Sequence, residues 1–289
     1  MERKRNMKLG TRLLVLLCMM AFGLVLLSIA SVLLVKSDML IQLTAQDILV
    51  FIVPAVAAMA IFYRRPLHAM QLDRAPSWRA IMVVVLFYFL SLPAMNWLVE
   101  FNKSMALPAS LSAIEEAMRV AEDAAAELTE DLLSFKSVGM LIACTLVVGF
   151  MAGLSEEMLF RGAMLRTMQD SRLGPHVAVW IVAILFSAFH LQFYGFIPRM
   201  VLGAWLGYLL VWTRSLWVPI IAHTLNNSTV VVLSYLANIG VVDQDMGDTI
   251  GLPADGAFPW LALCSLVACL ALALWAGKHI THSEKKPQI

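Results

Sequence analysis

Long apolar stretches alternate with short polar segments along almost the whole chain. A helix needs about 20 mostly apolar residues to cross a bilayer, and most of these stretches reach or approach that length. The first stretch is also longer than the apolar core of a signal peptide, about 7–15 residues, so we interpret it as a retained span. The pattern predicts an all-α, polytopic transmembrane helix bundle of about eight spans. The predicted spans are residues 13–35, 47–63, 79–99, 138–167, 176–196, 198–213, 216–237 and 258–277.

The polar segment between the third and fourth predicted spans has a helical pattern of its own. Its apolar residues recur at alternating intervals of three and four, which places them on one helix face, and acidic residues occupy the other face. The segment is too polar to span, so we expect an amphipathic extracytoplasmic helix that packs on the outer surface of the bundle. A coiled-coil partner is the alternative. The apolar positions are Leu111, Ile114, Met118, Ala121, Ala125, Leu128 and Leu132.

The composition supports a membrane protein. Of the 289 residues, 61% are hydrophobic and 14% are charged, and the mean hydropathy is +0.80. Soluble domains carry about 25% charged residues. The net charge of +1 gives no basic field that would attract nucleic acid. We therefore expect the lipid bilayer, and no nucleic acid, among the partners.

Basic residues gather in alternate loops, and this distribution predicts the orientation of the chain. With eight spans, most of them fall on one side together with both termini, whereas the loops that hold residues 100–136 and 243–255 fall on the other side and are acidic. Both termini should therefore be cytoplasmic. Arg199 is the exception, because this topology places it near the outer face. The basic residues that define the cytoplasmic side include Arg12, Arg64, Arg65, Arg74, Arg79, Arg166, Arg172, Arg214 and Lys278.

Three charged residues, Glu156, Glu157 and Arg161, lie within the apolar stretch that runs from Val138 to about Thr167. A charge at the centre of a bilayer costs at least about 2.5–3.5 kcal/mol, so each one needs a partner, water or a proton. Glu157 and Arg161 are four residues apart and can form an ion pair on one helix face, which a purely structural role would explain equally well. Glu156 points about 100° away. An unpaired carboxylate there is a candidate general base or acid.

Two further predicted spans carry polar groups: His190 in 176–196, and His223 with Asn227 in 216–237. Asn227 follows His223 by four residues, so both lie on one helix face. Counted at about 1.5 Å per residue, His190 would lie deeper in its span than His223. Either histidine could simply be satisfied by an interhelical hydrogen bond. If the three helices converge, however, they bring together a carboxylate, a histidine and hydrogen-bond donors, which suits hydrolysis by an activated water.

These polar residues form three motifs on successive apolar segments. The motifs are Glu156-Glu157-x-x-x-Arg161, Phe186-x-x-x-His190 and His223-x-x-x-Asn227. In this order they resemble the motifs of the CPBP family, which comprises the CAAX proteases and bacteriocin-processing enzymes and is also called the Abi or Rce1-like family. The similarity covers about Val138 to Leu236. It implies that the chain is an intramembrane protease.

The resemblance also implies a role for each motif residue. Glu156 would activate water, Glu157 and Arg161 would orient it, His190 would be a water or metal partner, and His223 with Asn227 would stabilise the oxyanion. No cofactor is certain. Zinc is possible, held by Glu156, His190 and His223, since two histidines and a carboxylate form a known catalytic zinc set. We slightly favour the metal-free scheme, because Glu156 would otherwise have to bind the metal and act as the base.

We therefore expect a CAAX prenyl protease 2-like intramembrane metalloendopeptidase, a hydrolase that cleaves a membrane or lipidated protein or peptide. The resemblance places it as a multi-pass protein in a bacterial cytoplasmic (inner) membrane. The alternatives are a non-catalytic membrane scaffold or immunity protein, and an ion-coupled transporter that uses the same buried polar residues. Three regions are predicted: 1–137 with three spans and the acidic loop, 138–237 as the catalytic core, and 238–289 with the last span and tail.

Overall fold

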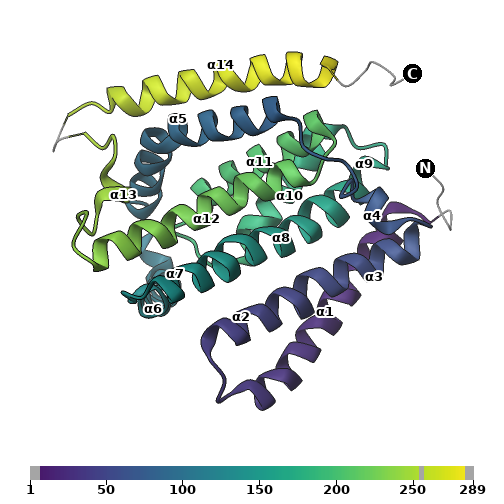
Figure 1. Cartoon of the computed structure of the whole chain (residues 1–289), viewed down its shortest axis with the longest axis horizontal. Coiled ribbons are helices and arrows are strands. Elements are labelled where there is room, and N and C mark those ends of the chain that lie inside the picture. The colour runs from purple at the N-terminus through teal and green to yellow at the C-terminus, as the bar shows by residue number, and fades with distance from the viewer. Residues whose placement is uncertain (1–6, 254–256, 284–289) are drawn as a thin grey trace.

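The computed structural model describes residues 7–253 and 257–283. Over these residues the chain is helical and has no strand (Figure 1). Seven helices of the described chain are long and apolar enough to cross a membrane. The predicted polytopic helical bundle is therefore confirmed.

The spans follow the predicted order, and two of them are continuous helices that contain π-helical turns. The spans are α1 (Leu9–Leu34); Met39–Phe62, made of α2 (Met39–Gln46), η1 (Asp47–Ile52) and α3 (Val53–Phe62); α5 (Trp78–Lys103); Val138–Gln169, made of α7 (Val138–Cys144), η3 (Thr145–Met151), α8 (Ala152–Glu157), η4 (Met158–Leu165) and α9 (Arg166–Gln169); α11 (Phe196–Thr213); α12 (Trp217–Asn238); and α14 (Trp260–Ser283). The shorter elements are α4 (Pro66–Ala69), η2 (Ala109–Leu111), α6 (Ser112–Leu133), α10 (Pro175–Phe189) and α13 (Met246–Thr249).

The predicted span 176–196 is wrong in length. Its helix, α10, has 15 residues and ends at Phe189, so it is about 22 Å long and shorter than a bilayer core. Leu191 then adopts a left-handed conformation with φ of 56°. Ser187 Oγ donates a hydrogen bond of 2.7 Å to the carbonyl of Phe196 and ties α10 to the start of α11. The two helices form a hairpin whose turn lies at residues 190–195.

The second span begins earlier than predicted. The sequence pattern placed it at 47–63, but the helix starts at Met39, directly after Asp38. The Asp38 side chain caps the helix by accepting a hydrogen bond of 2.9 Å from the Leu40 amide. Asp47 therefore lies inside the span, eight residues after its start, and not at its edge.

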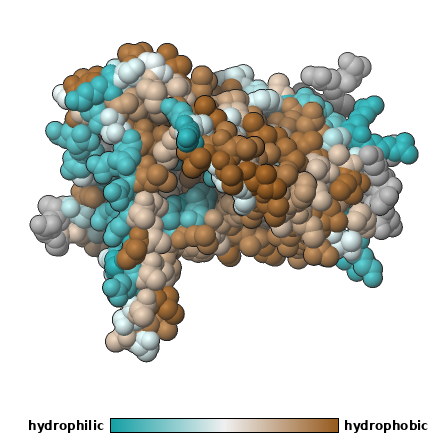
Figure 2. Space-filling model, turned by 90° about the horizontal axis from the view of Figure 1, so that it is seen from below, coloured by the Kyte–Doolittle hydropathy of each residue, from teal (hydrophilic) through white to brown (hydrophobic). Residues whose placement is uncertain are grey.

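The first and last spans and the polar helices mark two opposite ends of the bundle. Figure 1 shows that α1 begins and α14 ends at the same end of the bundle, whereas α6 and α13 lie at the opposite end. The surface between these ends is mainly apolar in the view of Figure 2. The described chain is thus a multi-pass membrane protein with a polar helix at one end.

The apolar stripe predicted for α6 makes only part of the contact with the bundle, chiefly at its C-terminal end, where Leu132 packs against a buried cluster that contains Leu133. Three residues of the stripe, Leu111, Ile114 and Leu128, are 41%, 54% and 55% exposed. A narrow projection at the lower left of Figure 2, at the horizontal position of α6 in Figure 1, shows polar residues along one side and apolar residues along the other. Most of the helix surface is therefore free of contact with the described bundle.

The acidic edge of α6 also docks, on the turn between α10 and α11. Tyr194 donates from its amide to Glu122 Oε2 at 3.3 Å, and from its hydroxyl to Glu115 Oε1 at 3.4 Å. Arg119 stacks over the Tyr194 ring at 4.3 Å and binds Glu115 at 2.7 Å. These bonds lower the pKa of Glu115, chiefly through Arg119. One aromatic side chain thus ties the polar helix to the hairpin.

Two glycines let the fourth span approach α12 closely. Gly149 and Gly153 are four residues apart on one face, the small-xxx-small pattern of closely packed membrane helices. A Cβ on Gly149 would lie 2.3 Å from Ser228 Oγ, and one on Gly153 would lie 3.0 Å from Thr224 Oγ1 and 3.2 Å from its backbone nitrogen. The backbones meet because neither glycine carries a side chain. This contact sets the spacing of the two helices that carry the polar motifs.

Candidate active site

Glu157 and Arg161 form a fully buried ion pair. Arg161 Nη1 donates to Glu157 Oε1 at 2.6 Å, and both side chains have an exposed fraction of 0%. Arg161 Nη2 also donates to the carbonyl of Gly203 in α11 at 2.8 Å. Removing one partner of such a pair would leave an uncompensated buried charge. The bond from Arg161 to Gly203 also holds η4 against α11.

His223 joins α12 to this pair. Its Nδ1 lies 2.9 Å from Glu157 Oε1, the same oxygen that Arg161 binds. An ionised carboxylate can only accept hydrogen bonds, so we assign the Nδ1 proton to this bond. The other ring nitrogen, Nε2, then points toward Glu156, whose Oε2 is 3.9 Å away. The imidazole is fixed from one side and leaves its second nitrogen for chemistry.

Within the described chain, Glu156 also contacts His223 but, unlike Glu157, has no hydrogen bond to it or to an arginine, although Oε2 of Glu157 is buried without a hydrogen-bond partner. The Glu156 side chain is 15% exposed, and its Oε2 is likewise buried without a hydrogen-bond partner in the described chain. It lies close enough to His190, Arg199 and Asp47 to interact electrostatically with all three. Buried carboxylate oxygens normally have partners, so an unpartnered one needs a specific explanation. The predicted division of roles between Glu157 and Glu156 stays a prediction.

Phe186 brings the third motif to the same place. Its ring covers the Arg161 guanidinium at 4.5 Å and lies edge-on to the rings of His190 and His223, at centroid distances of 5.1 and 5.9 Å. His190 Nδ1 binds the Phe186 carbonyl at 2.8 Å, so its Nε2 is the nitrogen left for another partner. His190 directly follows the last turn of α10, and Phe186 places it near His223.

Asn227 lies apart from these residues. Its Nδ2 donates to the carbonyl of Val148 in η3 at 3.2 Å, and its Oδ1 accepts from Asn226 Nδ2 at 3.2 Å. No hydrogen bond within the described chain joins Asn227 to His223 or to either glutamate. The second N–H of its amide is the group that a substrate oxygen could use. The convergence of His223 and Asn227 on one point therefore stays a prediction.

The sequence patterns missed Asp47. This residue is 6% exposed, and its Oδ1 accepts a hydrogen bond of 2.9 Å from Ser155 Oγ, beside Glu156. The apolar run from Met39 to Thr44 is the signal that could have placed Asp47 inside a span instead of at its edge. Asp47 also opens the π-helical stretch η1, and π-helical turns are frequent at functional sites. The second span thus adds a carboxylate to the polar cluster.

Arg199, the basic residue that the predicted topology left unexplained, extends from the first turn of α11. Its Nη2 donates to Gln192 Oε1 at 2.8 Å, and its Nη1 is buried without a hydrogen-bond partner in the described chain. The guanidinium lies within electrostatic reach of both Glu122 on α6 and Glu156. It therefore lies between the polar helix and the unpaired glutamate.

The residues predicted to hold zinc match the metal in donor type alone. Both histidines use Nδ1 for a protein oxygen and leave Nε2 for another ligand, an arrangement typical of metal-binding histidines. Across the part of the chain that the structure describes, however, no three His, Cys, Asp or Glu side chains are grouped so that they could hold a metal ion. The present arrangement does not fit a three-ligand site, and no step below is routed through a metal.

Comparison with known proteins supports the family resemblance. Residues 138–229 match the family described as type II CAAX prenyl endopeptidase Rce1-like. This segment carries an Rce1-like domain. It contains every motif residue discussed above, and it lies within the predicted core 138–237. The flanking spans, including the one that carries Asp47, lie outside the match.

One curated relative from Bacillus subtilis (strain 168), the "Uncharacterized protein YpbD", is 30% identical over 100 residues. The match covers 33% of this chain and 46% of the relative, so the chain spans about half of the length of that protein. No solved structure matches the chain. The comparisons therefore concern the domain that holds the candidate site, and the activity of the whole protein is a proposal.

Proposed function

We propose that this protein is an intramembrane endopeptidase that hydrolyses a peptide bond in or beside the bilayer through a glutamate-activated water. One observation carries the proposal. Glu156 Oε2 is buried and unpartnered in the described chain, 3.9 Å from the outward nitrogen of a histidine that Glu157 holds in place. A general base requires an available oxygen within reach of the water it activates, and Glu156 meets this requirement.

In the proposed first step, Glu156 takes a proton from a water molecule while the water oxygen bonds to the carbonyl carbon of the substrate. The carbonyl π electrons move to its oxygen, and His223 Nε2–H donates a hydrogen bond to this oxyanion. When the intermediate collapses, the C–N bond breaks and Glu156 returns the proton to the leaving amine. His223 must carry protons on both nitrogens to act as this donor, because Glu157 accepts the Nδ1 proton.

The role proposed for Glu157 and Arg161 is to orient His223. The two carboxylates are adjacent in sequence, yet only Glu157 binds Arg161 and His223 Nδ1. This pair fixes the ring so that Nε2 points toward Glu156, whereas the resemblance implied that it orients the water itself. His190 would bind the water through Nε2, and Asn227 would donate to the substrate through its second N–H.

The substrate class follows from the family and the location of the site. The Rce1-like match supports a CAAX-protease-like activity, and the candidate site lies among membrane spans, so we propose a membrane-embedded or lipidated protein or peptide as substrate. We propose cytoplasmic termini, which the basic residues near the chain ends support, and a bacterial inner membrane, which the family resemblance implies.

The test is a comparison of membrane-protein cleavage between wild type and Glu156→Gln. Cells that express either form are compared by quantitative peptide mapping of membrane proteins, and each new cleavage product is then reproduced with purified protein in liposomes. Products that require Glu156 support the proposal. Identical product sets for the two forms would reject it. Glu116→Gln, which changes an exposed acid on α6, serves as the matched control.

Asp47 favours one second candidate, a proton-coupled transporter. Asp47 is buried and lies within electrostatic reach of the half-buried Glu156, and intramembrane acids also serve as proton relays. Proton uptake by liposomes that contain the protein, measured with a pH dye under an imposed voltage, discriminates between the two functions. Flux that Asp47→Asn abolishes in a variant with intact cleavage would favour transport. A catalytically silent scaffold would show neither flux nor Glu156-dependent cleavage.

A further inference from the structure

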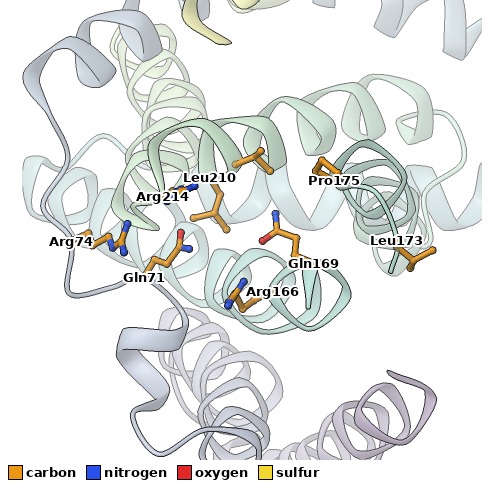
Figure 3. Close-up of a pocket in the computed structure, with 9 residues that line it drawn as sticks. Gln71, Arg74, Arg166, Gln169, Leu173, Pro175, Leu210 and Arg214 are labelled. Atoms are coloured by element: carbon orange, nitrogen blue, oxygen red, sulfur yellow. The ribbon is translucent and has the colours of Figure 1, made fainter. Parts of the chain in front are cut away.

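A polar pocket lies at the end of the bundle where α1 begins, away from the candidate active site. Its volume is about 400 Å³. Figure 3 shows that its side chains come from separate segments: the loop after α4, the end of the fourth span, the start of α10 and the end of α11. The polar lining residues are Gln71, Arg74, Arg166, Gln169 and Arg214.

The pocket has an excess of positive charge. Three arginines line it, and no acidic residue is among the lining residues. Asp170 binds Arg166 at 3.0 Å and also binds Arg12 at 3.3 Å. Arg74 and Arg214 are exposed and form no ion pair within the described chain. An anion would therefore complete the charge balance of the pocket.

The backbone around the pocket is held in an unusual conformation. Gln71 and Arg214, with φ of 63° and 53°, are two of the three described non-glycine residues in the left-handed region. Such conformations cost about 1–3 kcal/mol and persist where the surrounding structure imposes them. Here Gln71 O accepts from the Leu216 amide at 3.1 Å, and Arg74 O accepts from Ser215 Oγ at 2.5 Å. The two loops are thus joined and place their arginines on one pocket.

Two further features specify the ligand. Gln71 Oε1 is buried without a hydrogen-bond donor in the described chain, so a ligand that carries a hydroxyl group would satisfy it. Pro175 is the first residue of α10, and the positive end of a helix favours anions. The C-terminus of α11, which carries a partial negative charge, also faces the pocket, and the positive charge of Arg214 offsets it. The lining therefore suits an anion with hydroxyl groups.

We propose that this pocket binds a phosphate ester that carries a hydroxyl group, supplied either by the headgroup of an anionic phospholipid or by a soluble phosphate ester. Arginine matches the geometry of phosphate oxygens, and basic pockets between membrane helices bind anionic headgroups. The pocket lies at an end of the bundle, where headgroups are found. The site is independent of the proposed peptidase activity, and its test measures binding alone.

The test uses the full-length protein purified in a mild detergent. Retention of phosphatidylglycerol is compared with that of phosphatidylcholine by native mass spectrometry, and sn-glycerol 3-phosphate and inorganic phosphate are added as soluble competitors. We expect selective retention of phosphatidylglycerol. Displacement by millimolar glycerol 3-phosphate would identify a soluble ester as an equally good ligand, whereas no selective binding of any of the four would overturn the proposal.

Two double variants distinguish binding in this pocket from a general attraction of anionic lipid to positive charge. Arg74→Gln combined with Arg214→Asn should reduce phosphatidylglycerol retention by about 25-fold, from roughly fivefold for each arginine. Asparagine is chosen at position 214 because it tolerates the left-handed conformation. The control, Arg79→Gln with Arg172→Gln, removes the same charge from the same end outside the pocket. Equal losses in both double variants would overturn the proposal. Arg74→Gln alone, at an ordinary backbone position, should reduce phosphatidylglycerol retention about fivefold. Unchanged retention in this well-folded variant would also overturn the proposal.

Discussion

Glu157 Oε1 is shared by Arg161 Nη1, at 2.6 Å, and His223 Nδ1, at 2.9 Å. One carboxylate oxygen therefore links an arginine on its own helix to a histidine on α12. Glu156, the preceding residue, has no hydrogen bond to its Oε2 in the described chain. Two adjacent glutamates thus have different environments, and substitutions should separate their roles.

Glu157→Gln should reduce both folding yield and activity. The amide leaves Arg161 as a buried charge without its carboxylate, and breaking a buried pair costs about 3–5 kcal/mol. Glu156→Gln should abolish cleavage and leave yield nearly normal, because Oε2 of Glu156 makes no hydrogen bond in the described chain that the amide would break. Size-exclusion profiles, thermal unfolding and cleavage of one substrate measure these effects. Indistinguishable variants would show that the two residues do not divide the roles as proposed.

Asn227→Ala should lower turnover by about 10²–10³, the usual effect of removing one oxyanion donor. Loss of its bond to Val148 should also cost about 1 kcal/mol of stability. Asn226→Ala, which removes only a bond to Asn227, should be mild. The measurement is kcat on one substrate, normalised to folded protein. If Asn227→Ala loses stability but keeps its turnover, the residue is structural and the donor role fails.

Gly153→Val should separate α12 from the fourth span and so lengthen the contact between His223 and Glu157. Even a Cβ at this position meets Thr224 at 3.0 Å, including a backbone nitrogen at 3.2 Å that has little freedom to move. We expect reduced stability and loss of cleavage. Gly139→Ala is the matched control, because a Cβ there contacts only Ser137 Oγ at 3.5 Å. It should be neutral or slightly stabilising, since alanine favours a helix.

The stability of α6 should fall at low pH. Arg119, one turn along the same helix, holds the pKa of Glu115 below its usual value, so the stabilising contribution is complete above about pH 4.3, the value for an unperturbed glutamate, and is lost as the pH falls through the lower value in the folded helix. Hydrogen exchange of the α6 amides between pH 3 and 7, corrected for intrinsic exchange rates, measures the stability of this helix at each pH. Glu115→Gln should remove this dependence and Glu116→Gln should keep it. A flat profile in wild type would contradict the expectation.

The loop that holds residues 64–77 and the segment that holds α6 should lie on opposite sides of the membrane. In the fold they occupy opposite ends of the bundle (Figure 1), and the basic residues of the first loop predict that it is cytoplasmic. Alkaline phosphatase and fluorescent protein fusions at the two places report the side directly. Phosphatase activity from the 64–77 fusion would invert the proposed orientation.

The sequence by itself determined what depends on composition and on local spacing. Apolar runs of about 20 residues predict the helix bundle, because such helices present apolar side chains to lipid and satisfy their backbone hydrogen bonds internally. The four-residue spacing of Glu157 and Arg161 fixed their ion pair, because it is a property of one helix. The order of the three motifs identified the family resemblance. None of these inferences needed to know which helices are neighbours.

Only the tertiary structure decided what depends on neighbours. The spacing of His223 and Asn227 placed both on one face, yet their partners, Glu157 and Val148, come from another span that two glycines allow to approach. The site gained Asp47 because the second span starts at Met39, directly after Asp38, and not at Asp47. Loops distant in sequence meet at Gln71 and Arg214, and neither segment carries a signal for this contact. Contacts between helices depend on shape complementarity, which periodicity within a single helix does not encode.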